Sequence, residues 1–91
     1  MNETEFKIKL SNIKSAKSVT GKIYTLTDIA NENINFRRND NTKFEKISID
    51  ELYNFYKSEN IINTSTAKSY ISGRVQSPAV AILNEINKPA S

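Results

Sequence analysis

The sequence predicts an α+β domain: an N-terminal antiparallel β-meander of three to four strands, followed by three short helices packing on the sheet. Two observations indicate this order. Before Ser48 the apolar residues tend to alternate with polar ones, which is typical of half-buried strands. After Ser48 they recur every three or four residues, which is typical of amphipathic helices. The 91 residues are expected to form one domain over 1–87, with 88–91 as a frayed tail or the start of a linker.

The first strand is expected at residues 6–10, where three apolar residues alternate with two lysines. Lys7 and Lys9 would then lie on the polar face of the sheet. Residues 11–18 are polar and have little periodicity, so we expect a loop that holds at most a short helical turn.

The second strand is expected at residues 22–27, which are rich in β-branched and aromatic side chains and follow a turn at Gly21. A turn at residues 31–33 leads into the third strand. Successive side chains of a strand point to opposite faces, so Arg37 and Arg38 must point in opposite directions. The two arginines therefore cannot both be buried.

The fourth strand is expected at residues 44–49, after a turn at 39–41 whose Asn and Asp side chains can bond their own backbone. Phe44 is out of phase with Ile47 and Ile49, which predicts a bulge or an early end to regular pairing. The short turns between the strands indicate an antiparallel meander.

The first of the three helices is expected to begin at Ser48, because Ser48 and Glu51 have the spacing of a capping box. Tyr53, Phe55 and Tyr56 lie inside this helix. Such aromatic residues could stack on bases, but at this spacing they are more typical of a core.

The second helix is expected to be capped by Asn63 or Thr64 and to end at Gly73, since glycine accepts the left-handed conformation that follows a helix. The third is expected to have Ser77 as its cap and Pro78 as its first residue.

The turn between these last two helices is a candidate anion site. The free N–H groups and partial positive charge at a helix start can hold a phosphate, with Arg74 and Ser77 as additional donors. Gln76 could then reach a base edge, as side chains do in a helix-turn-helix. The same residues also suit an ordinary structural connection.

The composition argues against several classes of function. The chain has no cysteine and no histidine, so it lacks thiolate and imidazole metal ligands and the commonest proton shuttle. Glu5-Phe6-Lys7 has the E-x-K spacing of metal-dependent nucleases, but no aspartate partner is identifiable. We expect no enzyme activity, no cofactor and no metal. No stretch approaches the ~20 apolar residues of a membrane span, so we expect a cytoplasmic protein without a membrane partner.

The distribution of charge favours a polyanionic partner. The net charge is +3, and five lysines but no acid lie between Phe6 and Leu26. This segment is either an electrostatic footprint or a solvated face. There are three arginines, a residue type whose planar fork suits phosphates and base edges.

We therefore expect a non-enzymatic nucleic-acid-binding module that takes double-stranded DNA. Its candidate contact residues are Lys7, Lys9, Lys22, Arg37, Arg38, Arg74, Gln76 and Ser77. A lysine-faced sheet joined to short helices is similar in architecture to accessory or recognition domains of restriction and mobile-element proteins. A protein–protein interaction module, such as an accessory subunit or inhibitor, is the alternative, and the chain could belong to a larger parent protein.

Overall fold

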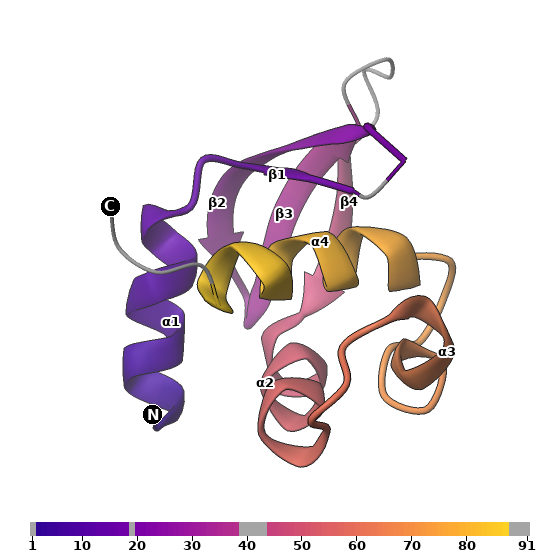
Figure 1. The fold of residues 1–91 in the computed structure, drawn as a ribbon. Helices are drawn as coiled ribbons and strands as arrows, with labels where there is room; N and C mark the ends of the chain where they lie inside the picture. Colours follow the sequence, from indigo (N-terminus) through magenta and orange to yellow (C-terminus); the bar gives the residue numbers. More distant parts are fainter. Residues whose placement is uncertain (1, 19, 39–43, 88–91) are drawn as a thin grey trace.

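The computed structural model describes residues 2–18, 20–38 and 44–87. In chain order the elements are α1 (Glu3–Asn12), β1 (Ser15–Lys17), β2 (Ile23–Ala30), β3 (Asn33–Arg38), β4 (Phe44–Ser48), α2 (Ile49–Ser58), α3 (Thr64–Ala67) and α4 (Gln76–Asn87). The four strands form one antiparallel sheet in the order β1-β2-β3-β4. Figure 1 shows the later helices gathered on one side of this sheet. The predicted α+β meander is confirmed. The expected turn at 39–41 and the tail at 88–91 lie outside the described residues.

The prediction of a strand at residues 6–10 is wrong, because this segment lies within helix α1. Asn2 caps the helix by accepting a hydrogen bond from the Glu5 backbone N–H (2.8 Å). Phe6 and Leu10 are four residues apart and fully buried, whereas Ile8 is 57% exposed. The apolar period here is therefore helical, and Ile8 does not belong to the buried face.

Strand β1 lies in the segment that was expected to be a loop. It is three residues long, and only its central residue, Ala16, is buried. So short a strand leaves no readable alternation in the sequence, because it is defined by antiparallel pairing with β2.

The expected irregularity at Phe44 is also wrong, since β4 pairs with β3 in regular register throughout. Phe44 is out of phase with Ile47 because its side chain lies on the opposite face of the sheet. The bulge is in β2 instead, between Leu26 and Asp28.

The β2–β3 turn has two central residues, Asn31 and Glu32, with φ values of 52° and 64°. Ala30 pairs with Asn33 across this turn. Two positive φ angles define the hairpin turn whose twist matches that of the flanking strands. The predicted turn is confirmed, although Glu32 occupies a position that normally favours glycine.

Helix α2 begins as predicted, with the Ser48 side chain accepting a hydrogen bond from the Glu51 N–H (3.3 Å). The Glu51 carboxylate does not complete the capping box. It accepts hydrogen bonds from the backbone N–H and hydroxyl of Ser72 (3.1 and 3.0 Å). It thereby ties the segment before α4 to α2.

The start of α3 is confirmed with Asn63 as its cap, but the prediction that this helix ends at Gly73 is wrong, because α3 ends at Ala67. Gly73 does have the expected left-handed conformation, with a φ of 77°, in the segment before α4. Helix α4 begins at Gln76, so the prediction of Ser77 as its cap is wrong, and Pro78 is its third residue. Proline is tolerated there because the first turn of a helix has N–H groups without intrahelical partners.

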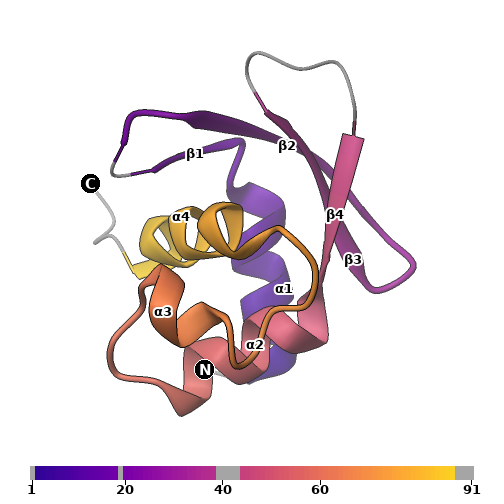
Figure 2. The same cartoon turned by 90° about the vertical axis from the view of Figure 1, so that its right-hand side faces the viewer.

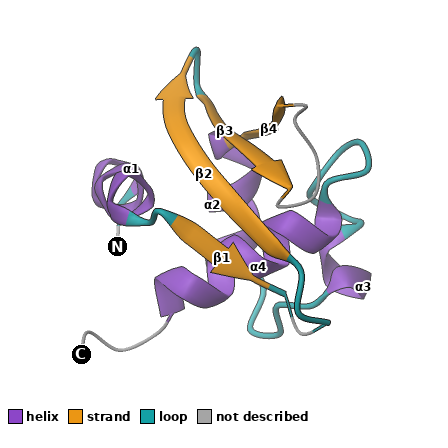
Figure 3. Ribbon diagram, turned by 90° about the horizontal axis from the view of Figure 1, so that it is seen from above, coloured by secondary structure: helices purple, strands orange, loops and turns teal. Residues whose placement is uncertain are grey.

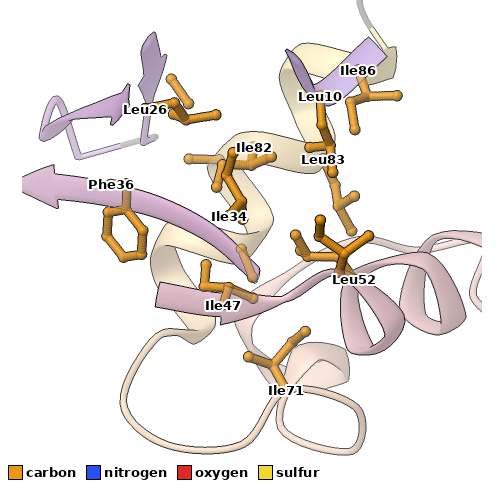
Figure 4. Packing of buried hydrophobic residues seen from close by; sticks show 14 of the residues in the cluster. Leu10, Leu26, Ile34, Phe36, Ile47, Leu52, Ile71, Ile82, Leu83 and Ile86 are labelled. Carbon is orange, nitrogen blue, oxygen red and sulfur yellow. The ribbon is translucent and has the colours of Figure 1, made fainter. Parts of the chain in front are cut away.

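Helix α4 lies between the sheet and the other C-terminal helices (Figure 2). Its buried residues are Pro78, Ala79, Ala81, Ile82, Leu83 and Ile86. Except for Pro78, they belong to the hydrophobic core of the described residues that also holds Leu52 and Ile71 (Figure 4). Within the described residues, no helix is long and apolar enough to cross a membrane. The face of the sheet turned away from α4 is here called the outer face, and no helix of the described part of the chain lies over it (Figure 3).

Candidate nucleic-acid interface

The meander brings basic residues from several strands to one end of the sheet. Because neighbouring strands are antiparallel, the last residues of β1 and β3 lie beside the first residues of β2 and β4. Lys17 pairs with Ile23, which Lys22 precedes, and Arg37 pairs with Phe44. Lys17, Lys22 and Arg37 are all exposed, so this end of the sheet presents three cationic side chains to solvent.

The segment before α4 adds a fourth cation. Arg38, the last residue of β3, donates a hydrogen bond from Nη2 to the backbone carbonyl of Arg74 (3.3 Å). This bond places Arg74, which is exposed, at the same end of the molecule. We call the exposed cations Lys17, Lys22, Arg37 and Arg74 the basic end.

The two neighbouring arginines have different surroundings, as the alternation of the strand requires. Arg38 points to the inner face, where its guanidinium bonds both carboxylate oxygens of Glu45 (2.6 and 3.3 Å) and lies 5.6 Å from the Tyr24 ring centre. Arg37 lies on the outer face, and no hydrogen bond or ion pair of its side chain is found among the described residues. Arg38 therefore joins β3 to β4 and to the segment before α4, whereas the Arg37 side chain can contact a ligand.

The turn before α4 has fewer side-chain groups free to bind a ligand than its sequence indicated. The Gln76 side-chain nitrogen donates to the carbonyls of Ile71 (2.9 Å) and Gly73 (2.6 Å). Its donor is therefore engaged inside the turn, which accounts for a glutamine at this position. Ser77 is exposed, but α4 itself is too deeply buried to enter a groove.

Lys7 and Lys9 lie on α1 and not at the basic end. Lys7 is 3.8 Å from the carboxylate of Glu32, in the turn at the opposite end of the sheet. Lys9 lies in the last turn of α1, which borders the part of β2 beyond its pairing with β1. The structure therefore separates these lysines from Lys22 and Arg37.

Acidic residues gather near the Lys7 position. The pKa of Glu3 is raised above its usual 4.5, and the largest cause is a hydrogen bond between its carboxyl and Asp50. Desolvation and the negative charges of Asp50 and Glu32 raise this pKa further, whereas the positive charge of Lys7 lowers it. We call Glu3, Glu32 and Asp50 the acidic end. Cations therefore predominate at one end of the sheet and acids beyond the other. Asp28 is an exposed acid between them on the sheet, where its carboxylate accepts a hydrogen bond from the Asn35 side chain (3.0 Å).

The outer face also carries residues that the sequence analysis did not single out. Phe44 is 65% exposed and Ile23 is 39% exposed, and Lys46 shares their face because it lies two residues after Phe44. Thr25 pairs with Arg37 in the centre of this face. The register of β3 and β4 is the signal that would have identified Lys46.

The described residues show no group of acidic side chains arranged to hold a metal ion. Glu5 and Lys7 lie in a helix, where residues two apart point about 200° from each other. They cannot share one face as the E-x-K pattern of a strand would require. A hollow of about 100 Å³ between the end of α1 and β2 is lined largely by apolar side chains, Leu10, Ile13, Leu26 and Ile29 among them.

Comparison with known proteins adds no assignment, because no family model, no curated protein and no solved structure matches the chain.

Proposed function

We propose that this chain is a non-enzymatic, cytoplasmic module that binds double-stranded DNA at its basic end. An accessory or recognition domain of a restriction or mobile-element protein would have such a function. Lys17 was not among the residues first expected to bind, and it takes the place of Lys7 and Lys9 in the proposal.

The observation that carries the proposal is the convergence of four exposed cations from four separate segments, while the acids of the acidic end lie away from them. A duplex presents a dense row of phosphates, and cations that approach it release condensed counterions. The separation of charge orients the molecule, because the acidic end is repelled by the same phosphates.

The alternative is a protein–protein interaction module. Phe44 and Ile23 favour it, because exposed apolar side chains on one face are typical of protein interfaces. The two functions differ in how binding responds to salt. Phosphate contacts lose affinity steeply as salt rises, whereas contacts with an uncharged protein surface do not.

The test is the affinity of the chain for a labelled random-sequence duplex, measured by fluorescence anisotropy between about 50 and about 200 mM KCl. Four phosphate contacts predict a slope of log affinity against log salt of about −3.6. Lys17→Ala should reduce the magnitude of that slope by about one, because Lys17 is an exposed cation of the basic end.

Lys9→Ala is the matched control, because it removes an exposed lysine that lies outside the basic end. It should leave both affinity and slope unchanged. Absence of duplex binding at the lowest salt, or equal losses for the Lys9 and Lys17 variants, would contradict the proposal. The first result would favour the protein-interaction function.

A further inference from the structure

We infer that the outer face of the sheet enters the major groove of the duplex and that Arg37 reads a guanine there, with Lys17 and Lys46 on the flanking phosphates. The inference rests on the proposed function and deepens it, because it names the groove, the base and the residue that distinguishes sequences. Its basis is the position of five side chains on one face.

The strand register places the central residues in a single row. Ser15 pairs with Thr25, Thr25 with Arg37, and Arg37 with Phe44. Side chains directly opposite one another on antiparallel strands point to the same face. Thr25, Arg37 and Phe44 therefore form a short ridge across three strands.

The two lysines lie diagonally on either side of this ridge. Lys17 is two residues from Ser15 in β1, and Lys46 is two residues from Phe44 in β4, toward the other end of the sheet. Three strand spacings and four residues of strand rise separate their Cα atoms by roughly 20 Å. The major groove is ~12 Å wide. Lysines at this separation lie over the two phosphate walls when the ridge lies over the floor of the groove.

The shape of the sheet agrees with this arrangement. Figure 2 shows the sheet curving over α4, so that the outer face is convex. A convex face can enter a groove, and the major groove is wide enough to admit paired β-strands. The minor groove, at ~6 Å, is too narrow for them.

Arg37 has the chemistry and the freedom to read a base. A guanidinium can donate two parallel hydrogen bonds to guanine O6 and N7, and this pair of acceptors is presented only in the major groove. Arg38, its neighbour, is held by Glu45 and the Arg74 carbonyl. Phe44, beside Arg37, offers an apolar surface to a thymine methyl group.

The experiment begins with selection of binding sites from a randomised duplex library by the wild-type chain. An enriched guanine is expected in the selected duplexes. That guanine is then replaced by 7-deazaguanine, which lacks the N7 acceptor of the major groove, or by inosine, which lacks only the minor-groove amino group. The 7-deazaguanine duplex should bind the wild type about tenfold more weakly, and the inosine duplex should bind nearly as the parent does.

Arg37→Lys and Arg38→Lys form a matched pair, since each retains its charge and removes one guanidinium fork. Arg37→Lys should keep the salt dependence and lose the preference for guanine over 7-deazaguanine. Arg38→Lys should lower Tm, because it loses the Glu45 contact, and should keep that preference. Thermal melts confirm that each variant is folded.

The outcomes separate this inference from the proposed function. Duplex binding without an enriched guanine, greater sensitivity to inosine than to 7-deazaguanine, or retention of guanine preference by Arg37→Lys would each overturn the major-groove assignment and leave DNA binding intact. Absence of any duplex binding would overturn both.

Discussion

Replacement of Phe6 by alanine should destabilise the protein far more than replacement of Ile8, and the difference follows from the helical geometry of α1. Phe6 is fully buried, and its ring centre lies 5.3 and 5.4 Å from those of Tyr53 and Tyr56 on α2. Loss of its transfer free energy, together with the cavity left behind, should cost about 3–5 kcal/mol. Ile8 is 57% exposed, so Ile8→Ala should change stability by no more than about 0.5 kcal/mol.

Urea unfolding of the two variants, followed by circular dichroism, measures both values. The Phe6 variant should lose a large part of the roughly 5–14 kcal/mol expected for a domain of this size. The slope of free energy against urea should stay the same, so that the midpoints can be compared directly. If the two substitutions cost the same, residues 6–10 alternate as a strand does, and the assignment of α1 is refuted.

Three further predictions concern stability. Glu3→Gln should raise the free energy of unfolding at pH 7 and have no effect below about pH 4.5. The raised pKa of Glu3 in the folded state means that folding favours its protonated carboxyl. Ionised Glu3 therefore lowers the stability of the protein only at a pH where the carboxyl of the unfolded chain is ionised. Urea titrations at both pH values check this, and an equal effect at both would contradict it. Glu32→Gly should raise stability by about 0.5–1 kcal/mol, because glycine adopts the φ of 64° at this position without strain. The substitution removes only an exposed ion pair with Lys7. A lower urea midpoint for this variant would show that the turn is not strained. Ser48→Ala should cost about 1 kcal/mol, whereas Ser77→Ala should cost little because Ser77 caps no helix; similar losses for both serines would contradict the observed start of α4.

The sequence was sufficient to predict the order of strands and helices after residue 20. Ser48 and Asn63 could be identified as helix caps because a cap depends on a hydrogen bond to a residue three positions away. The opposite orientations of Arg37 and Arg38 were also predictable, since strand alternation is local. Structural features that depend on residues a few positions apart can be predicted from the sequence.

The errors at the N-terminus have a physical cause. In residues 6–10 the lysines separate apolar residues that are two apart, so the strand and helix periods both fit a segment this short. The cap at Asn2 and the acidic residues of the first turn, Glu3 and Glu5, are the local signals that favour a helix here. Strand β1 could not be read at all, because its hydrogen-bonding partners lie on β2.

The candidate interface was predictable only in part. Arg37 was identified from its residue type, and Arg74 from its place before a helix. Their convergence with Lys17 depends on the pairing of β1, β2 and β3 and on a hydrogen bond between Arg38 and Arg74, residues 36 positions apart. The pairing of Arg38 with Glu45 removed one candidate for the same reason, since such contacts are not local in sequence.

Binding of duplex DNA through the basic end and the outer face can be tested by mapping the surface that contacts a duplex. In a titration of the ¹⁵N-labelled chain with a short duplex, NMR chemical shifts report which backbone amides sense the ligand. Binding through the basic end and the outer face should perturb the amides of Lys17, Lys22, Thr25, Arg37, Lys46 and Arg74, and these perturbations should fade as salt is added. Lys9 and Glu32 should be unaffected. Perturbations confined to α1 and the acidic end, or none at any duplex concentration, would contradict it.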